Sequence, residues 1–299
     1  MAKAKRLIQT GRGFELELPT SYEEMKREAE ATIAKLVAKH PKAKKMWGLL
    51  RKDAEVNACW DMANYIAVGC LKYNDHGDVH ARITAANALK MLKLLLDNGV
   101  QTNIMEMKAG DEDDVYLVVL TAALLHDLGN QVHREDHHLH SVYLAIPILN
   151  RLLPELYKDP EVMFEIRGHI LHAIYAHPAH VKDLTKEAAL VGIADGTDMT
   201  KGRGRMAFDS GNVNIHSVSA LAIEKVEIKQ GTECPIQILV HMSNSAGIFQ
   251  LQDNLGEKLV DSPLEDHVEI VAQTSPVSPS HDQRILHKII IRRGRFEAI

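Results

Sequence analysis

The strongest constraint on this 299-residue chain is an uninterrupted apolar run near its middle, at residues 115–125. The run reads Val-Tyr-Leu-Val-Val-Leu-Thr-Ala-Ala-Leu-Leu, follows an acidic loop at 110–114, and ends directly at His126-Asp127. Because it is far shorter than the roughly 20 residues that cross a bilayer, we expect a helix buried in a protein core and no membrane span. The sequence therefore places His126 and Asp127, two side chains that can bind a metal ion, at the end of a buried helix.

Composition narrows the class of protein without naming it. A hydrophobic content of 45% with 25% charged residues is typical of a globular protein with a sizeable core. The net charge of -5 does not imply binding to nucleic acid, which would need a local basic patch. Three cysteines without CxxC spacing argue against a disulfide scaffold, and residues 7–10 are too short for a signal-peptide core. The cytoplasm is the expected location.

Periodicity changes near residue 215. Before it, apolar spacing, capping residues and Gly or Pro breaks predict helices at 21–39, 42–71, 78–98, 115–127, 137–153, 159–176 and 185–198. After it, short β-branched segments at 226–229, 236–240, 268–271 and 285–291 predict strands, and 243–259 suits one amphipathic helix.

This pattern predicts a mainly α protein, a helical bundle with a small C-terminal α+β domain. We expect an N-terminal helical segment at residues 1–72 that packs on a central helical domain at 73–215. The α+β domain would span residues 216–299.

Histidine is concentrated beside the apolar run, since nine of the 17 histidines lie between His126 and His180, under a fifth of the chain. One helix offers only neighbours at i+3 and i+4, so the imidazole and carboxylate ligands of a metal come from several helices. His80 begins one predicted helix and His126-Asp127 ends another. Asp195 follows Leu-Val-Gly-Ile-Ala, and a carboxylate in such a context is costly unless it is paired or bound to metal.

These residues resemble the HD-domain superfamily of metal-dependent phosphohydrolases, whose pattern is a His, a His-Asp pair and a distant Asp. His80, His126-Asp127 and Asp195 match it in order, and the resemblance covers about residues 75–200. The segment His-Asp-Leu-Gly is similar to the His-Asp-Ile-Gly that is frequent in the family. The resemblance implies a helical HD domain with a metal held by these four residues and with Asp127 in the catalytic centre.

A subset of the superfamily binds two metals, and the chain offers further histidines for the second one. His140 lies 14 residues after His126, a spacing similar to that in the HD domain of ribonuclease Y, and His177 ends a segment similar to the family's Ala-Ile-x-x-His. The resemblance implies that Asp127 bridges one metal on His80, His126 and Asp195 and another on His140 and His177.

Two positions depart from the family pattern. Pro178 follows His177 where many relatives have a second histidine, so an additional ligand would be His169 or His172. Asn130 stands where a lysine often follows the His-Asp pair, which removes one phosphate contact. The remaining histidines of this stretch, at 133, 137, 138 and 180, are interpreted as solvated loop or helix-end residues.

The expected chemistry is hydrolysis by a metal-activated hydroxide that attacks phosphorus without a covalent enzyme intermediate, with a nearby histidine protonating the leaving group. Mixed imidazole and carboxylate ligands suit one or two divalent transition metals per chain. Iron or manganese is favoured, and zinc, cobalt and nickel are compatible.

A cationic segment directly after Asp195 suggests the substrate. Lys201, Arg203 and Arg205 would bind phosphate oxygens close to the metals. We expect a small phosphomonoester or phosphodiester, a nucleotide or an oligonucleotide. The alternative, a glycine-loosened surface turn with solvated charges, stays open.

Two other functions fit the same pattern. Proteins similar to myo-inositol oxygenase resemble HD domains that hold two irons, and His140 with His177 is compatible with such a diiron oxygenase. Alternatively, the HD domain is a non-catalytic, metal-stabilised scaffold. The C-terminal domain would then sense a ligand, for instance at residues 242–249 where a strand leads through a loop into a helix, or form a homodimer.

Overall fold

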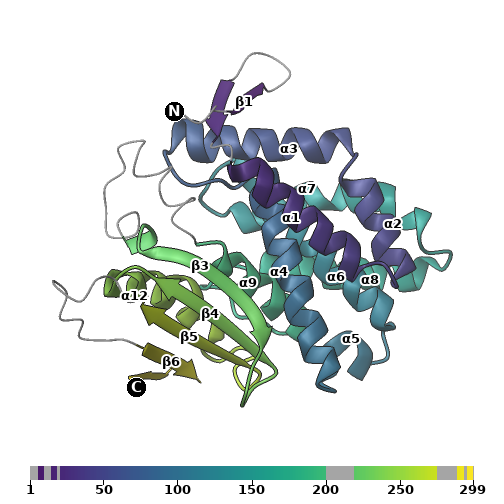
Figure 1. Cartoon of the computed structure of the whole chain (residues 1–299). Helices are drawn as coiled ribbons and strands as arrows, with labels where there is room; N and C mark the ends of the chain where they lie inside the picture. The colour runs from purple at the N-terminus through teal and green to yellow at the C-terminus, as the bar shows by residue number, and fades with distance from the viewer. Residues whose placement is uncertain are drawn as a thin grey trace.

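A computed structural model of the chain describes residues 6–9, 15–18, 21–199, 219–274, 288–292 and 295–298. It shows a body of helices with a five-stranded sheet packed against one side (Figure 1). The expected mainly α fold with a small C-terminal α+β domain is confirmed. The predicted phosphate-binding residues Lys201, Arg203 and Arg205 lie outside the described residues.

The helices of the described chain are α1 (Ser21–Leu36), α2 (Pro41–Leu50), α3 (Ala54–Asn64), α4 (Asp78–Asp97), α5 (Asn103–Glu106), α6 (Glu112–Leu125), α7 (His137–Leu152), α8 (Pro160–Tyr175), α9 (Lys186–Thr197), α12 (Ile248–Leu251) and α13 (Glu257–Leu259). The strands are β1 (Arg6–Gln9), β2 (Glu15–Leu18), β3 (Ile223–Gln230), β4 (Ile236–Met242), β5 (Val268–Thr274), β6 (Lys288–Arg292) and β7 (Arg295–Ala298).

Helix α6 contains the apolar run and forms the centre of the helical body. Asp111 and Asp114 start it with a reciprocal capping box, and every residue from 115 to 125 is buried. The helices α2, α4, α8 and α9 pack around it, so the helix has no face left for solvent. Near its end, the indole of Trp60 donates a hydrogen bond to the carbonyl oxygen of Leu124 at 3.1 Å. The His126-Asp127 pair therefore follows a helix that is enclosed on all sides.

Several expected elements differ in detail. The helix predicted at 42–71 is divided, because the Asp53 side chain accepts the N–H groups of Glu55 and Val56 and so starts α3 anew. The chain before α1 holds an antiparallel pair, β1 and β2, instead of helix alone. The helix expected at 243–259 is a succession of short α, 3₁₀ and π turns.

The C-terminal sheet has the order β3-β4-β5-β6-β7. Strands β4 and β5 are parallel, joined through the helical turns of residues 245–259, and the other neighbours are antiparallel. β7 adds a strand beyond the last one predicted. Ile236, Ile238 and Val240 on β4 are fully buried in the same hydrophobic core as the helices. One core thus joins the sheet to α4 and α9, which lie between the sheet and the rest of the helical body (Figure 1).

Within the described ranges, no helix is both long enough and apolar enough to span a membrane.

Candidate metal centre

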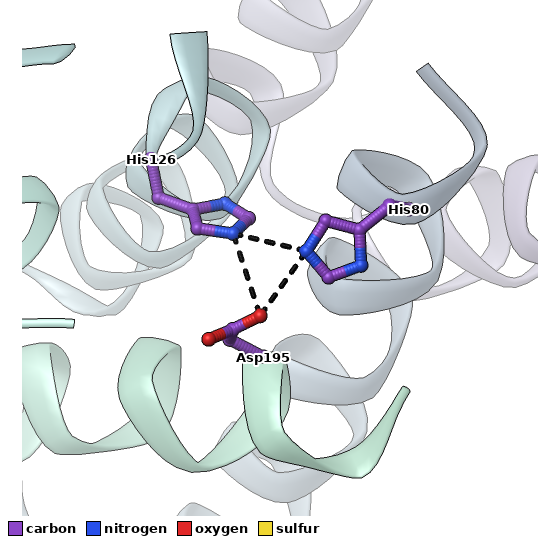
Figure 2. A group of neighbouring side chains, drawn as sticks. All are labelled: His80, His126 and Asp195. Atoms are coloured by element: carbon purple, nitrogen blue, oxygen red, sulfur yellow. Dashed lines mark hydrogen bonds and ion pairs between the residues drawn. The ribbon is translucent and has the colours of Figure 1, made fainter. Parts of the chain in front are cut away.

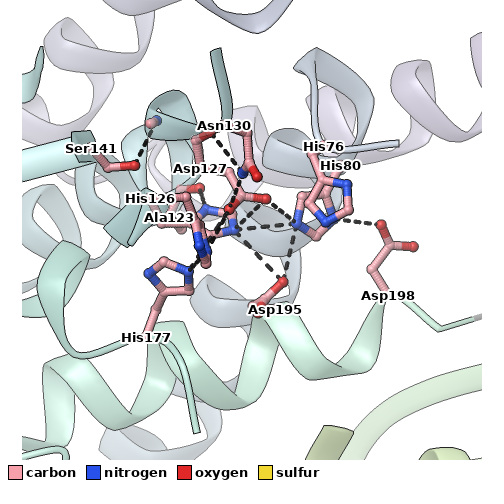
Figure 3. A network of polar contacts seen from close by, with 12 residues as sticks. His76, His80, Ala123, His126, Asp127, Asn130, Ser141, His177, Asp195 and Asp198 are labelled. Carbon is pink, nitrogen blue, oxygen red and sulfur yellow. Dashed lines mark hydrogen bonds and ion pairs between the residues drawn. The ribbon is translucent and has the colours of Figure 1, made fainter. Parts of the chain in front are cut away.

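Five of the residues expected to bind metal gather where helices begin and end (Figure 3). His80 lies in the first turn of α4, where Asp75 accepts its backbone N–H at 3.0 Å. His126 and Asp127 follow the last residue of α6, His177 follows α8 closely, and Asp195 lies on α9.

A first group joins three of these residues from three helices (Figure 2). The Nε2 atom of His80 lies 3.2 Å from Nε2 of His126 and 3.1 Å from Oδ1 of Asp195. Nε2 of His126 is 3.7 Å from the same Asp195 oxygen. Oδ2 of Asp127 lies 3.4 Å from Nε2 of His80 and 3.5 Å from Nε2 of His126. The structure therefore brings together the four residues predicted for the first metal.

A second group forms around the other oxygen of Asp127. Nε2 of His137 lies 3.0 Å from Nε2 of His177 and 3.4 Å from Asp127 Oδ1. Nε2 of His177 is 3.8 Å from that same oxygen. The two carboxylate oxygens of Asp127 thus face two different histidine pairs.

All four rings turn Nε2 inward, because each Nδ1 has an outward partner that can only accept a hydrogen bond. His126, His137 and His177 donate Nδ1–H to the carbonyl oxygens three residues earlier, at 2.8, 3.0 and 2.7 Å. His80 donates to Asp198 Oδ2 at 2.7 Å. A neutral imidazole with a proton on Nδ1 carries a bare lone pair on Nε2. In this form the Nε2 lone pairs of His80 and His126, and those of His137 and His177, would face each other across about 3 Å, an arrangement that a cation between them would stabilise.

The charge states of these side chains also favour a bound cation. Burial works to raise the pKa values of Asp127 and Asp195, but the neighbouring histidines, and Lys258 beside Asp195, hold both well below their usual range. Burial lowers the pKa of His137 to about 4 and holds that of His177 well below its ordinary value. At neutral pH the carboxylates are ionised and these imidazoles neutral, which favours a bound cation.

The donor set fits a transition metal. Two ligand atoms with bonds of about 2.1 Å lie about 3.0 Å apart at a right angle and about 3.4 Å apart at a tetrahedral angle. Separations of 3.0–3.8 Å within the cluster are close to these values. Outer hydrogen bonds that fix the ring orientation, such as the one from His80 to Asp198, are the usual support of metal-binding histidines.

The structure places the other expected ligands elsewhere. His140 lies one turn beyond His137 on α7, and its Nδ1 has no hydrogen-bond partner in the described part of the chain. No ring nitrogen of His140 is paired with a carboxylate in that part either. His169 and His172 lie on α8, outside both groups, and Nε2 of His172 is buried without a described partner.

Sequence reasoning missed His137. The prediction that His137 is solvated is wrong, since only 7% of the residue is accessible to solvent. Gly129 explains the burial: a Cβ at this position would lie 1.9 Å from the carbonyl oxygen of His137, so only glycine allows α7 to begin this close to Asp127. The Gly129 N–H also donates to Ser141 Oγ at 2.8 Å. Glycine at 129 was visible in the sequence, but the contact that it permits was not.

Polar residues outside the two groups fix the carboxylates. Asn130 donates its side-chain N–H to Asp127 Oδ1 at 2.8 Å and accepts a hydrogen bond from Arg134 at 3.1 Å. Lys258 donates to Asp195 Oδ2 at 2.7 Å.

Comparison with known proteins identifies the family of this chain. The family model described as HD domain matches residues 86–200, a segment that begins just after His80. An uncharacterized protein of Methanocaldococcus jannaschii is 45% identical over 240 residues, which cover 80% of this chain and 92% of that protein. No solved structure matches the chain significantly. The chain belongs to the HD-domain superfamily, whose members are generally metal-dependent phosphohydrolases.

A pocket of about 190 Å³ lies beside the cluster, between residues 177–183 and residues 257–262. Asp183 in its wall is buried, and its Oδ1 has no hydrogen-bond partner among the described residues. Burial raises the pKa of Asp183 to about 7, although nearby Lys258 opposes the shift. In the folded protein this carboxyl is therefore mostly protonated below about pH 7.

Asp183 predicts a pH dependence of stability. The unfolded carboxyl loses its proton near pH 4 and the folded one near pH 7, so its favourable contribution is complete below pH 4 and is lost as the pH rises to 7. In Asp183→Asn the side chain at this position is neutral at every pH. At pH 8 we expect the metal-free variant to be more stable than the parent by roughly 2–4 kcal/mol, with no difference near pH 4, measured by denaturant unfolding. The exposed pocket residue Glu257 gives the control Glu257→Gln, and a parent-like pH profile for Asp183→Asn would contradict the prediction.

The second histidine pair predicts which residue of α7 contributes to metal binding. If His137 is a ligand, His137→Ala lowers the metal content from two equivalents to one, measured by elemental analysis after exhaustive dialysis. His140→Ala, the matched control one turn away, retains two equivalents. The reverse result would restore the assignment based on sequence spacing.

Proposed function

We propose that this protein is a metal-dependent phosphohydrolase that hydrolyses a small phosphomonoester or phosphodiester, a nucleotide or an oligonucleotide. Two divalent ions would be held by His80, His126 and Asp195 on one side of Asp127 and by His137 and His177 on the other. Iron or manganese suits this mixture of imidazole and carboxylate best, and zinc, cobalt and nickel are compatible.

The observation that carries the proposal is the division of the Asp127 carboxylate. Oδ2 lies within 3.5 Å of His80 and His126, and Oδ1 lies 3.4 Å from His137. A carboxylate whose two oxygens face two separate sets of nitrogen ligands is suited to bridge two ions. When bound, such ions lower the pKa of a coordinated water toward about 7 and polarise a phosphoryl oxygen.

The chain's own residues supply orientation and charge. Asn130 fixes Asp127 from the side of Oδ1. Asp198 holds the His80 ring with Nε2 turned inward. Asp195, with a side-chain exposure of 23%, is the most accessible of the proposed ligands, so a substrate would approach along its side.

Arg134 favours a phosphorylated substrate over the alternative of an oxygenase. Its guanidinium is held by Asn130, lies 4.0 Å from Asp127 Oδ1, and keeps 38% of its side chain exposed. A guanidinium fork matches two phosphate oxygens. Asn130 stands where a lysine is frequent in the family, and Arg134, four residues further along the chain, would provide the missing cation. Lys201, Arg203 and Arg205 remain further proposed phosphate contacts.

Activity can be tested with the metal-loaded protein against p-nitrophenyl phosphate, bis-p-nitrophenyl phosphate, nucleotides and short oligonucleotides. We expect hydrolysis under anaerobic conditions that a chelator abolishes and that manganese or ferrous iron restores. Asp127→Asn removes the proposed bridge, so turnover should fall on the order of 100-fold or more.

Each alternative has its own signature in this experiment. Oxygen consumption by the iron-loaded protein without phosphate release would favour an oxygenase. Full metal loading with neither reaction would favour a non-catalytic scaffold.

Arg134 predicts a separate effect on substrate binding. Arg134→Ala should raise KM for the phosphorylated substrate about tenfold or more with unchanged metal content, because a charged hydrogen bond to phosphate contributes about 1.5–3 kcal/mol. Arg134→Lys retains the charge but not the planar fork, so its KM should lie between those of the parent and of Arg134→Ala. Steady-state kinetics with elemental analysis checks this. A parent-like KM in Arg134→Ala would remove the residue from the binding site.

A further inference from the structure

We propose that Lys258, from the C-terminal α+β domain, is a positioning residue that sets the orientation of Asp195 in the metal centre. The inference rests on the proposed metal centre, but it does not depend on which substrate is hydrolysed.

Lys258 contacts a proposed metal ligand, Asp195, directly. Nζ donates to Asp195 Oδ2 at 2.7 Å and to the carbonyl oxygen of Gly192 at 2.8 Å. The other oxygen of Asp195, Oδ1, lies 3.1 Å from His80 Nε2 and 3.7 Å from His126 Nε2. The two carboxylate oxygens thus have different partners, since Oδ2 binds the ammonium group and Oδ1 faces the first metal position.

This division matters because a carboxylate can bind a metal through one oxygen or through both. With Lys258 on Oδ2, the Asp195 side chain is held in one rotamer and offers one oxygen. Only 8% of the Lys258 side chain is exposed, so water does not screen the ion pair as it does at a surface. Removing the ammonium group would leave the partly buried Asp195 carboxylate without its charged partner and free to rotate.

The fold brings Lys258 to this position by a close approach of two backbones. Gly196, the neighbour of Asp195, lies against the turn Gln252–Gly256, and a Cβ at 196 would be 2.2 Å from the carbonyl oxygen of Asn254. Only glycine allows this contact. Helix α13, which carries Lys258, follows this turn and packs on α9. The C-terminal domain therefore supplies a charge to the centre as well as covering α9.

Metal affinity provides a test that is independent of catalysis. Metal-free protein is titrated with Mn²⁺ by calorimetry. Lys258→Met preserves the apolar stem but not the charge. We expect affinity at one of the two sites to fall about 10–100-fold, the effect typical for residues that orient a ligand. Lys258→Arg should restore most of it. Lys229→Met removes an exposed lysine of the same domain and should bind like the parent.

A double-mutant cycle ties the effect to Asp195. In an Asp195→Asn background, Lys258→Met should cause no further loss, because the residue that Lys258 orients has lost its charge. A full additional loss in that background would overturn the proposal.

Chemical rescue separates positioning from a merely structural role. The pocket of about 190 Å³ is lined by Lys258, so truncation to alanine leaves room for a small ion. In Lys258→Ala, added propylammonium should recover at least tenfold of the lost Mn²⁺ affinity, and propanol of similar shape should not.

Unchanged affinity in Lys258→Met, or equal rescue by propanol, would overturn the inference alone. A parent protein that binds no metal would overturn the proposed function itself.

Discussion

The structure depends on one arrangement of polar groups: the carboxylates of Asp127 and Asp195 lie among four imidazole rings whose Nε2 atoms point inward. Each ring is fixed by an outward hydrogen bond from Nδ1, three of them to carbonyl groups that end a helix or precede one. Carbonyls at a helix end need partners in any case, so satisfying them and aiming the rings are the same interaction. The helices α4, α6, α7, α8 and α9 must converge for this arrangement to exist, and the core accounts for that convergence.

The two halves of the cluster are supported differently. In the half around His80 and Asp195, Asp198 holds the His80 ring, and Lys258 on the C-terminal domain holds Asp195. The half around His137 and His177 is local to the turn after α6 and the ends of two helices. Asp127 belongs to both halves, with one carboxylate oxygen facing each histidine pair.

Much of this could be predicted from the sequence, and particular residues explain where prediction stopped. The buried helix at 115–125 was evident because its apolar run is unbroken, and His80, His126 and Asp195 fitted a spaced pattern that the structure brings together. His137 follows Arg-Glu-Asp, which indicates a solvated turn, and only the tertiary contact at Gly129 buries it. The contact between Lys258 and Asp195 joins residues 63 positions apart in the sequence. No local sequence pattern predicts a contact over such a separation.

The enclosure of α6 has a thermodynamic consequence. Every residue between 115 and 125 is buried, so the position of His126 and Asp127 is determined when the hydrophobic core forms. The conformational entropy of these side chains is therefore lost during folding, so it does not reduce the free energy of metal binding. Without metal, the inward-facing ring nitrogens and the carboxylates lie close together in the folded protein. A bound ion would relieve their repulsion. If the proposed centre binds metal, the metal supply of the cell would thereby affect the stability of the whole chain.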